Sequence, residues 1–206
     1  MPKKNEPIYV AVSAPSGAGK TSICKEVLKM FPRLRYSVSY TTRPPRPGEV
    51  NGRDYVFVDE KTFRRMIEKE AFIEWAENYG HLYGTPRKEV ENYLRRGYDL
   101  MFDVDPRGAK ALRERYPGGI FVFVLPPSLE VLKRRLRGRG SESPEALKRR
   151  FEKATAEIKE VFWYDYVIFN RDIEESADRL RAVYLAEKSR RERLVKEITP
   201  FIGQID

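Results

Sequence analysis

The sequence predicts an α/β protein in which a central parallel sheet lies between two layers of helices. Apolar runs with strand character alternate with helical patterns along most of the chain, which is typical of parallel sheets. The first run, Ile8–Val12, passes through a glycine-rich turn directly into a helical segment. The alternation stops at about residues 36–94, which predicts an inserted lobe. At 206 residues the chain fits one domain, residues 1–206, with residues 8–35 and 95–206 as its core.

The core elements are expected in alternating order. Pro32 should end the first helix, because proline has no backbone N–H to donate, and Ser128 is placed to cap a later one. The polar stretch Arg137–Glu145 contains glycines and no apolar stripe, so a mobile lid is expected at about 137–147. The expected core elements are the helix Lys20–Met30, the strand Leu100–Phe102, the helix Gly108–Arg115, the strand Ile120–Leu125, a helix from Ser128 to Leu136, a helix from Pro144 to Val161, the strand Tyr166–Phe169 and a helix from Ile173 onward.

The inserted segment begins with a loop, because prolines and glycines crowd Thr41–Asp54. Phe72 and Trp75 are expected in the core, and His81 in a loop. Thr85 is expected to cap a helix that has proline at its first position. The expected elements are the strands Asp54–Val58 and Phe72–Asn78 and the helices Lys61–Lys69 and Pro86–Arg96.

Composition limits the classes of partner. With 41% hydrophobic and 34% charged residues, the chain has enough apolar side chains to fold around a core. Its net charge of +9 and pI of about 9.6 favour phosphate-bearing partners of any kind. A single cysteine, Cys24, excludes an internal disulfide and a multi-cysteine metal site. The N-terminal apolar run is too short for a signal peptide or a membrane span, so a soluble, cytoplasmic protein without a membrane partner is expected.

The turn after the first strand matches the phosphate-binding loop, or P-loop. Only its first position departs from the pattern of glycine, four residues, Gly-Lys and Ser or Thr, because Ala14 replaces the glycine. Such a loop curls so that backbone N–H groups point at phosphate oxygens. Lys20 would place an ammonium on the terminal phosphates, and Thr21 would offer a hydroxyl to Mg²⁺. The alternative is a glycine turn that only caps a helix. The residues expected to bind a nucleoside triphosphate are Ala14, Pro15, Ser16, Gly17, Ala18, Gly19, Lys20, Thr21 and Ser22.

Two carboxylates follow the strand Leu100–Phe102. Asp103 stands at its end, where a carboxylate that supports Mg²⁺, directly or through water, is usual in P-loop enzymes. Asp105 would point to the same side if the strand continued. The alternative is an ordinary strand-end aspartate or a helix cap.

The proline-rich loop carries two arginines, Arg43 and Arg46, and is followed by Tyr55. Guanidinium groups match phosphate oxygens in pairs, and a tyrosine hydroxyl can add a neutral donor. A solvated basic loop is the alternative interpretation.

From Ile8 to Tyr184 the chain resembles the guanylate kinase family, which phosphorylates GMP with ATP. The resemblance rests on separate motifs in a fixed order, a combination that chance matching does not produce. These motifs are Pro15–Thr21, Ser37–Arg43, Gly48–Gly52, Asp54-Tyr55, Phe72–Trp75, Tyr83–Thr85, Asp103–Asp105 and Gly138–Gly140.

The resemblance implies roles for the matching positions. The inserted lobe, residues 36–94, would bind GMP, and the lid would close over ATP. The GMP phosphate would be held by Arg43, Arg46, Tyr55 and Tyr83. The base would be read by Ser39, Glu74, Thr85 and Asp105. The catalytic residues would be Lys20, Arg43, Asp103, Arg135, Arg139 and Arg150, with Asp103 also near the bound substrate. Asn170 would lie near the adenine of ATP.

Guanine presents its N1–H and N2 amine side by side, and one carboxylate, here Glu74, can accept from both. Adenine lacks this pair of donors and would leave buried groups unpaired. The alternative for Glu74 is a solvated strand residue. Pro106-Arg107 replaces the glutamine that many relatives carry, so the contact of that glutamine is absent and a positive charge is added. The tail Ser189–Asp206 lies beyond the resemblance.

The expected reaction is direct in-line transfer from ATP to GMP or dGMP with Mg²⁺, in purine nucleotide metabolism, by a monomer or a homodimer. Three alternatives remain: a binding module that has lost catalysis, a kinase for another small acceptor, and a nucleic-acid-binding protein. An intact Lys20 and Thr21 disfavour the first, and the base readers Glu74 and Thr85 disfavour the second. No recognisable nucleic-acid motif supports the third, so no nucleic-acid partner is expected.

Overall fold

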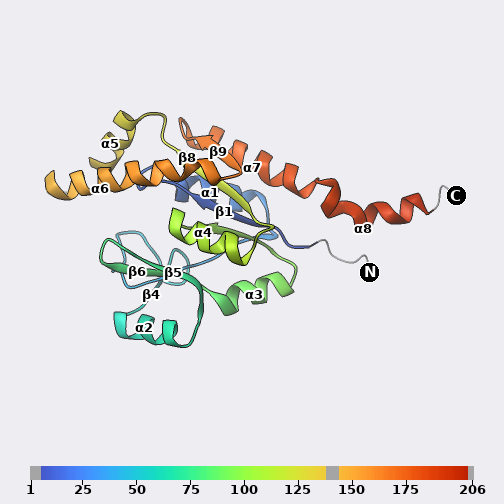
Figure 1. Cartoon of the computed structure of the whole chain (residues 1–206), viewed down its shortest axis with the longest axis horizontal. Helices are drawn as coiled ribbons and strands as arrows, with labels where there is room; N and C mark the ends of the chain where they lie inside the picture. The colour runs from blue at the N-terminus through green and yellow to red at the C-terminus, as the bar shows by residue number, and fades with distance from the viewer. Residues whose placement is uncertain (1–5, 138–143, 204–206) are drawn as a thin grey trace.

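The computed structural model describes residues 6–137 and 144–203. Five parallel strands form the main sheet in the order β2-β7-β1-β8-β9, which confirms the α/β fold with a central parallel sheet (Figure 1). Every inner strand is buried on both faces, as parallel sheets require. The strands are β1 (Tyr9–Ser13), β2 (Leu34–Tyr36), β7 (Asp99–Asp103), β8 (Ile120–Leu125) and β9 (Tyr166–Phe169).

Helices cover both faces of this sheet. On one face α1 (Lys20–Met30) and α7 (Ile173–Lys188) pack on the side chains of β1 and β8 that point their way. On the other face α3 (Arg87–Arg95) and α4 (Pro106–Arg115) bury the alternate side chains of β7 and β8. The remaining helical elements are α5 (Leu129–Arg137), α6 (Pro144–Ile158), the 3₁₀ helix η1 (Lys159–Trp163) and α8 (Arg191–Ile202).

A second, four-stranded sheet lies beside the main one, and residues 37–86 that contain it are called the small lobe below. Its strand order is β4-β3-β6-β5, and its own cluster of Phe63, Phe72 and Leu82 fills the space under α2. Figure 1 shows this lobe hanging below the main sheet, with α6 passing above it. Its elements are β3 (Tyr40–Thr41), β4 (Val56–Phe57), α2 (Glu60–Glu68), β5 (Phe72–Asn78) and β6 (His81–Pro86).

The register of the main sheet gathers polar residues at one edge. Val12 pairs with Asp103, so the carboxyl ends of β1 and β7 finish side by side. Loops that follow adjacent parallel strands at this edge are the usual place for ligands in open α/β sheets. The P-loop leaves β1 at this edge, and the chain enters the small lobe from the carboxyl end of β2 at the same edge.

Three expectations for the inserted segment were wrong. Thr85 and Pro86 end the strand β6 and α3 begins at Arg87, because the backbone N–H of Arg87 donates to Ala71 across the sheet. Trp75 is 48% exposed, since strand alternation sends it to the open face when Glu74 turns inward.

His81, the third, begins β6 rather than lying in a loop. The preceding residues Tyr79 and Gly80 have φ of 54° and 73°, the left-handed pair that closes a tight hairpin. The strand expected at Asp54–Val58 shrinks to Val56–Phe57, because Asp54 is engaged by Lys25 and by the backbone N–H of Val50.

The core elements that were expected match to within a few residues, whereas the edge strand β2 was not anticipated. The helix expected at Gly108 begins two residues earlier, at Pro106, and the end of the helix expected to reach Val161 becomes η1. Ser128 accepts a hydrogen bond from the N–H of Val131, as the cap of α5 should. Phe72 is buried as expected. Among the described residues, none of the helices combines the length and the apolar content needed to cross a bilayer.

Candidate active site

The P-loop runs from the end of β1 to the start of α1. Gly17 and Gly19 adopt φ of 93° and 92°, a left-handed conformation that residues with a side chain rarely tolerate. These two turns wrap the loop around the amino end of α1, where N–H groups without helical partners point outward. Cys24, one turn into α1, is buried in the core beneath the loop. The strand, loop and helix therefore stand in the order that phosphate binding requires.

Asp103 is the hub of polar contacts beside this loop. The Nζ of Lys20 lies 2.8 Å from its Oδ1, and the hydroxyl of Thr21 donates to its Oδ2 at 2.9 Å. Lys20 also donates to the carbonyl oxygen of Val104 at 2.5 Å. Tyr36, on β2, hydrogen-bonds to the same carboxylate, and burial together with the nearby Asp103 raises the pKa of this tyrosine well above its ordinary value. The ion pair holds the lysine amine at the sheet edge.

Asp105 does not continue the strand, because β7 ends at Asp103. It is the N-cap of α4, and its Oδ1 accepts from the backbone N–H of Gly108 at 2.9 Å. Its other oxygen accepts a 3.4 Å hydrogen bond from the amide of Asn78. Asp105 thus serves as the helix cap that the sequence left open as an alternative, and it still borders the same cleft as Asp103.

Arg43 is 7% exposed and paired within its own loop. Its Nη2 donates to both carboxylate oxygens of Glu49, at 2.8 and 2.9 Å, and its Nη1 donates to the carbonyl of Pro44. The guanidinium also lies 5.4 Å from the ring centroid of Tyr55. Burial raises the pKa of Tyr55 above its ordinary value, so its hydroxyl stays protonated and can donate.

Glu74 and Thr85 face each other across β5 and β6. The fully buried hydroxyl of Thr85 donates to Oε1 of Glu74 at 2.5 Å. Burial of Glu74 raises the pKa of its carboxyl to about 7, and the negative charge of Asp105 acts in the same direction, while the bond from Thr85 opposes them. The side-chain oxygen Oε2 would lie 3.0 Å from a Cβ added at Gly108, so α4 approaches this carboxylate closely because that position is glycine.

These groups surround one cleft of about 220 Å³ between the main sheet and the small lobe. Arg46 is exposed at its rim, and it contributes its backbone N–H to Glu49. The side chains of Arg43 and Thr85 do not line the cleft, but each contacts a residue that does: Arg43 lies against Tyr55, and Thr85 donates to Glu74. The predicted residues that line the cleft are Ala14, Pro15, Ser16, Gly17, Ala18, Gly19, Lys20, Thr21, Ser22, Ser39, Arg46, Tyr55, Glu74, Tyr83, Asp103 and Asp105.

The remaining predicted residues approach the P-loop from the side of α5 and α6. Arg135 donates to the carbonyl of Ala18 and to that of Asn170, both at 3.3 Å. Arg150 donates to the hydroxyl of Ser16 at 3.2 Å. Arg139, and with it most of the expected lid at 137–147, lies outside the described residues.

Asn170 is 1% exposed and packs against the back of the P-loop. Its Nδ2 donates to the carbonyl of Ala18 at 2.5 Å, and its Oδ1 accepts from Ser176 at 3.2 Å. The structure therefore places this amide against the loop backbone, as a buried support of the loop.

A substitution at Gly19 should test this support. An added Cβ would lie 2.3 Å from Nδ2 of Asn170, in addition to the strain of a φ of 92°. We expect Gly19→Ala to lower the melting temperature more than Gly52→Ala does, because Gly52 has a φ of 78° with no atom within 4 Å of the added Cβ. Thermal unfolding followed by circular dichroism measures both. Equal shifts would contradict close packing of Asn170 on the loop.

One further residue of the cleft, Glu157 on α6, was not anticipated. Its Oε2 accepts from the backbone N–H of Ser16 at 3.3 Å, and burial raises the pKa of its carboxyl. It follows Arg150 by seven residues and Lys153 by four, so the three share one helix face. That spacing is the signal that could have identified it.

Comparisons with known proteins point to one family. The family model described as guanylate kinase matches residues 6–187. A guanylate kinase of Geobacter metallireducens is 48% identical over 196 residues, covering 95% of this chain and 97% of the relative. A guanylate kinase of Syntrophus aciditrophicus is 52% identical over 190 residues, covering 92% and 91%.

Among solved structures, the guanylate kinase of Anaplasma phagocytophilum superposes with a TM-score of 0.76 at 34% identity, covering 93% of this chain and 90% of that one. The residues matched by the family model, 6–187, include the P-loop, the small lobe and the helices that meet at the cleft. The chain therefore belongs to the guanylate kinase family of enzymes.

Proposed function

We propose that this protein transfers the terminal phosphate of ATP to GMP or dGMP, forming ADP and GDP or dGDP. One observation carries the choice of acceptor: a partly buried carboxylate, Glu74, shares a cleft with the P-loop lysine. Glu74 can accept from both the N1–H and the N2 amine of guanine. An adenine in the same place would leave that carboxylate without its donors, which costs about 1–3 kcal/mol per buried group.

ATP binds with its phosphates in the curl of the P-loop, where Lys20 and the N–H groups at the start of α1 offset their charge. The GMP phosphate lies near Arg43, Arg46, Tyr55 and Tyr83, on the facing side of the cleft. This arrangement holds the attacking oxygen of GMP against the γ-phosphorus of ATP, in line with the leaving oxygen. The protein contributes positioning and charge, and no enzyme nucleophile is required.

Thr21 and Asp103 together fit a Mg²⁺ ion bound to the ATP phosphates. Their oxygens lie 2.9 Å apart at the mouth of the P-loop, a hydroxyl beside a carboxylate of the kind that Mg²⁺ prefers. Groups of three or more acidic, histidine or cysteine ligands are absent among the described residues. Mg²⁺ needs no such group, because it usually binds through one or two protein oxygens, phosphates and water. When bound, it would offset charge on the transferred phosphate.

A coupled assay of ADP release with GMP, AMP, CMP and UMP tests the proposal. We expect GMP to be phosphorylated efficiently and the other three poorly. Glu74→Gln should raise KM for GMP about tenfold or more and weaken the preference over AMP, because the amide offers one acceptor in place of two. Glu77→Gln, an exposed position on the same strand, is the matched control and should behave like wild type. Unchanged GMP kinetics in Glu74→Gln would exclude Glu74 as the base reader.

The raised pKa of Glu74 makes GMP use depend on pH. In the empty protein the carboxyl is protonated below about pH 7 and cannot accept from both guanine donors. Accordingly, kcat/KM for GMP should rise with pH through about 7, and this rise should vanish in Glu74→Gln. Because the folded protein holds this proton more tightly than the unfolded chain, the contribution of Glu74 to stability falls as the pH rises from about 4.5 to about 7. If kcat/KM for GMP had the same pH profile in the wild type and in Glu74→Gln, Glu74 would not be the group that binds guanine.

A further inference from the structure

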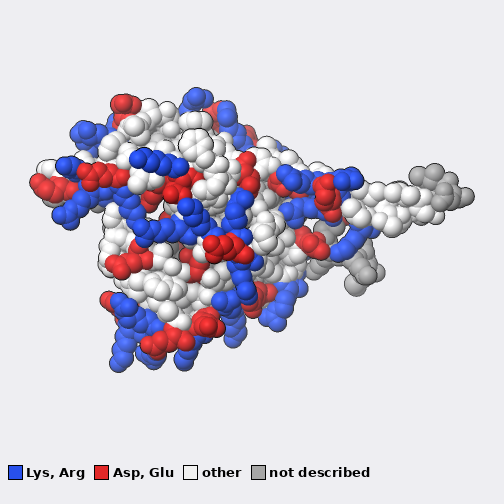
Figure 2. Space-filling view, viewed as in Figure 1, with Lys and Arg blue, Asp and Glu red and all other residues white. Residues whose placement is uncertain are grey.

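One turn of α6 touches both halves of the cleft. Lys153 and Glu157 are four residues apart, and Nζ of Lys153 lies 3.9 Å from Oε1 of Glu157. Lys153 reaches toward the small lobe, while Glu157 reaches the P-loop. Figure 2 shows Lys and Arg mixed with Asp and Glu on α6 and along the seam between α6 and the small lobe.

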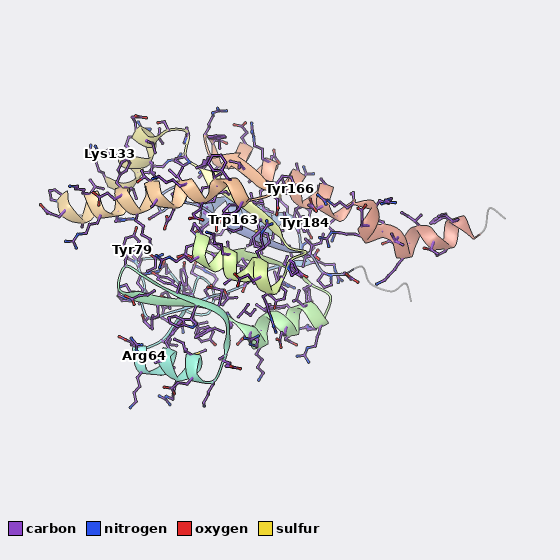
Figure 3. The ribbon with its side chains drawn as sticks, in the orientation of Figure 1. Arg64, Tyr79, Lys133, Trp163, Tyr166 and Tyr184 are labelled. Atoms are coloured by element: carbon purple, nitrogen blue, oxygen red, sulfur yellow. The ribbon has the colours of Figure 1, made fainter. Side chains whose placement is uncertain are left out.

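The contact of Lys153 with the small lobe involves the tip of the β5–β6 hairpin. Its ammonium donates to Oδ1 of Asn78 and lies 4.4 Å from the ring centroid of Tyr79. Figure 3 shows Tyr79 at this hairpin, facing α6. The Lys153 side chain is only 29% exposed, so these contacts replace most of its hydration. A solvated helix lysine would have neither the partner amide nor the ring.

Asn78 extends this contact to the predicted base-reading residues. Its Nδ2 donates to Asp105 at 3.4 Å while its Oδ1 accepts from Lys153. Asp105 in turn caps α4, whose Gly108 adjoins Glu74. The hairpin tip is therefore joined at once to α6 and to the part of the cleft proposed for guanine.

The contact of Glu157 is made one turn farther along the same face of α6. Its Oε2 accepts from the backbone N–H of Ser16, and Arg150 donates to the hydroxyl of that serine. The backbone N–H and the hydroxyl of Ser16 are thus both bonded to α6. The conformation of the P-loop and the position of α6 are tied together by these two bonds.

We infer that Asn78, Tyr79, Lys153 and Glu157, here called the clasp, couple the two nucleotide sites. A nucleotide that fixes the small lobe also fixes Asn78 and Tyr79. These two residues position Lys153 and the turn of α6 that carries it. Glu157, one turn farther along α6, then holds the P-loop in place. Linkage makes the effect reciprocal, so GMP should tighten ATP binding by the factor by which ATP tightens GMP binding. The clasp residues are positioning residues, and this inference rests on the proposed function.

The test measures binding of a non-hydrolysable ATP analogue by calorimetry, with and without saturating GMP. In the wild-type protein GMP should tighten the analogue about fivefold or more. Lys153→Met keeps the length of the side chain and removes the charge, and the factor should fall toward one. Lys148→Met is the matched control, because Lys148 is a 78% exposed lysine on the same helix, and it should keep the wild-type factor.

A second variant guards against misfolding. Asn78→Ala should lower the coupling factor as Lys153→Met does. The two variants remove the same contact, between Lys153 and Asn78. The double variant should therefore lower the coupling factor no further than the more affected single variant. Additive losses, an absent effect of GMP in the wild type, or an unchanged factor in Lys153→Met would each overturn the clasp. Phosphorylation of GMP by the wild type, measured in parallel, tests the proposed function separately: its absence contradicts that function, while its presence with unchanged coupling contradicts the clasp alone.

Discussion

Lys20→Ala is expected to lose on the order of 10³-fold in kcat while the fold survives. The ammonium of Lys20 lies where the P-loop meets Asp103, and removal takes away the cation proposed to act on the reacting phosphates. Steady-state kinetics with GMP and ATP measure the loss of kcat, and a melting curve shows whether the fold survives. Lys29→Ala, which changes a 69% exposed lysine on the same helix, is the control and should keep wild-type rates. A folded Lys20→Ala protein with near wild-type turnover would contradict the role of the lysine.

Asp103→Asn is expected to lower kcat by roughly 10²- to 10³-fold with little change in KM for ATP. The amide can still hydrogen-bond to Thr21, but it loses the charge that would support Mg²⁺. It also releases Lys20 from an ion pair, so binding of the ATP phosphates should not weaken. The Mg²⁺ concentration needed for half-maximal rate should rise.

Asp178→Asn, at an exposed position on α7, is the matched control for this variant. A rise in KM for ATP with unchanged kcat would indicate that Asp103 only organises the empty loop. An unchanged Mg²⁺ requirement would separate the carboxylate from the metal.

Most core elements could be predicted because local signals decide them, although the short edge strand β2 was missed. Ile8–Val12 and Ile120–Leu125 are apolar runs of strand length, and the glycines of the P-loop force the curl that the structure has. Strand β6 was missed, because Thr85-Pro86 carries the same residues as a helix start and only pairing with β5 decides between the two. Trp75 was misplaced for a similar reason: its face depends on where Glu74 points.

Site contacts were harder to predict than site residues. Arg43, Glu74 and Asp103 all lie at or beside the cleft, yet nothing in the sequence pairs Arg43 with Glu49 or Thr85 with Glu74. The contact of Glu157 with Ser16 joins positions 141 residues apart, and only the packed fold brings them together.

The pairing of Arg43 with Glu49 has a consequence for how tightly an anion is held. The guanidinium of Arg43, beside the cleft, already carries a carboxylate, so a phosphate bound by it as proposed would have to exchange with Glu49 rather than add to a bare cation. The observed affinity is then a difference between two ion pairs, smaller than the new contact alone would give. Because added salt weakens both pairs, the affinity should change less with ionic strength than a count of cations around the phosphate would suggest.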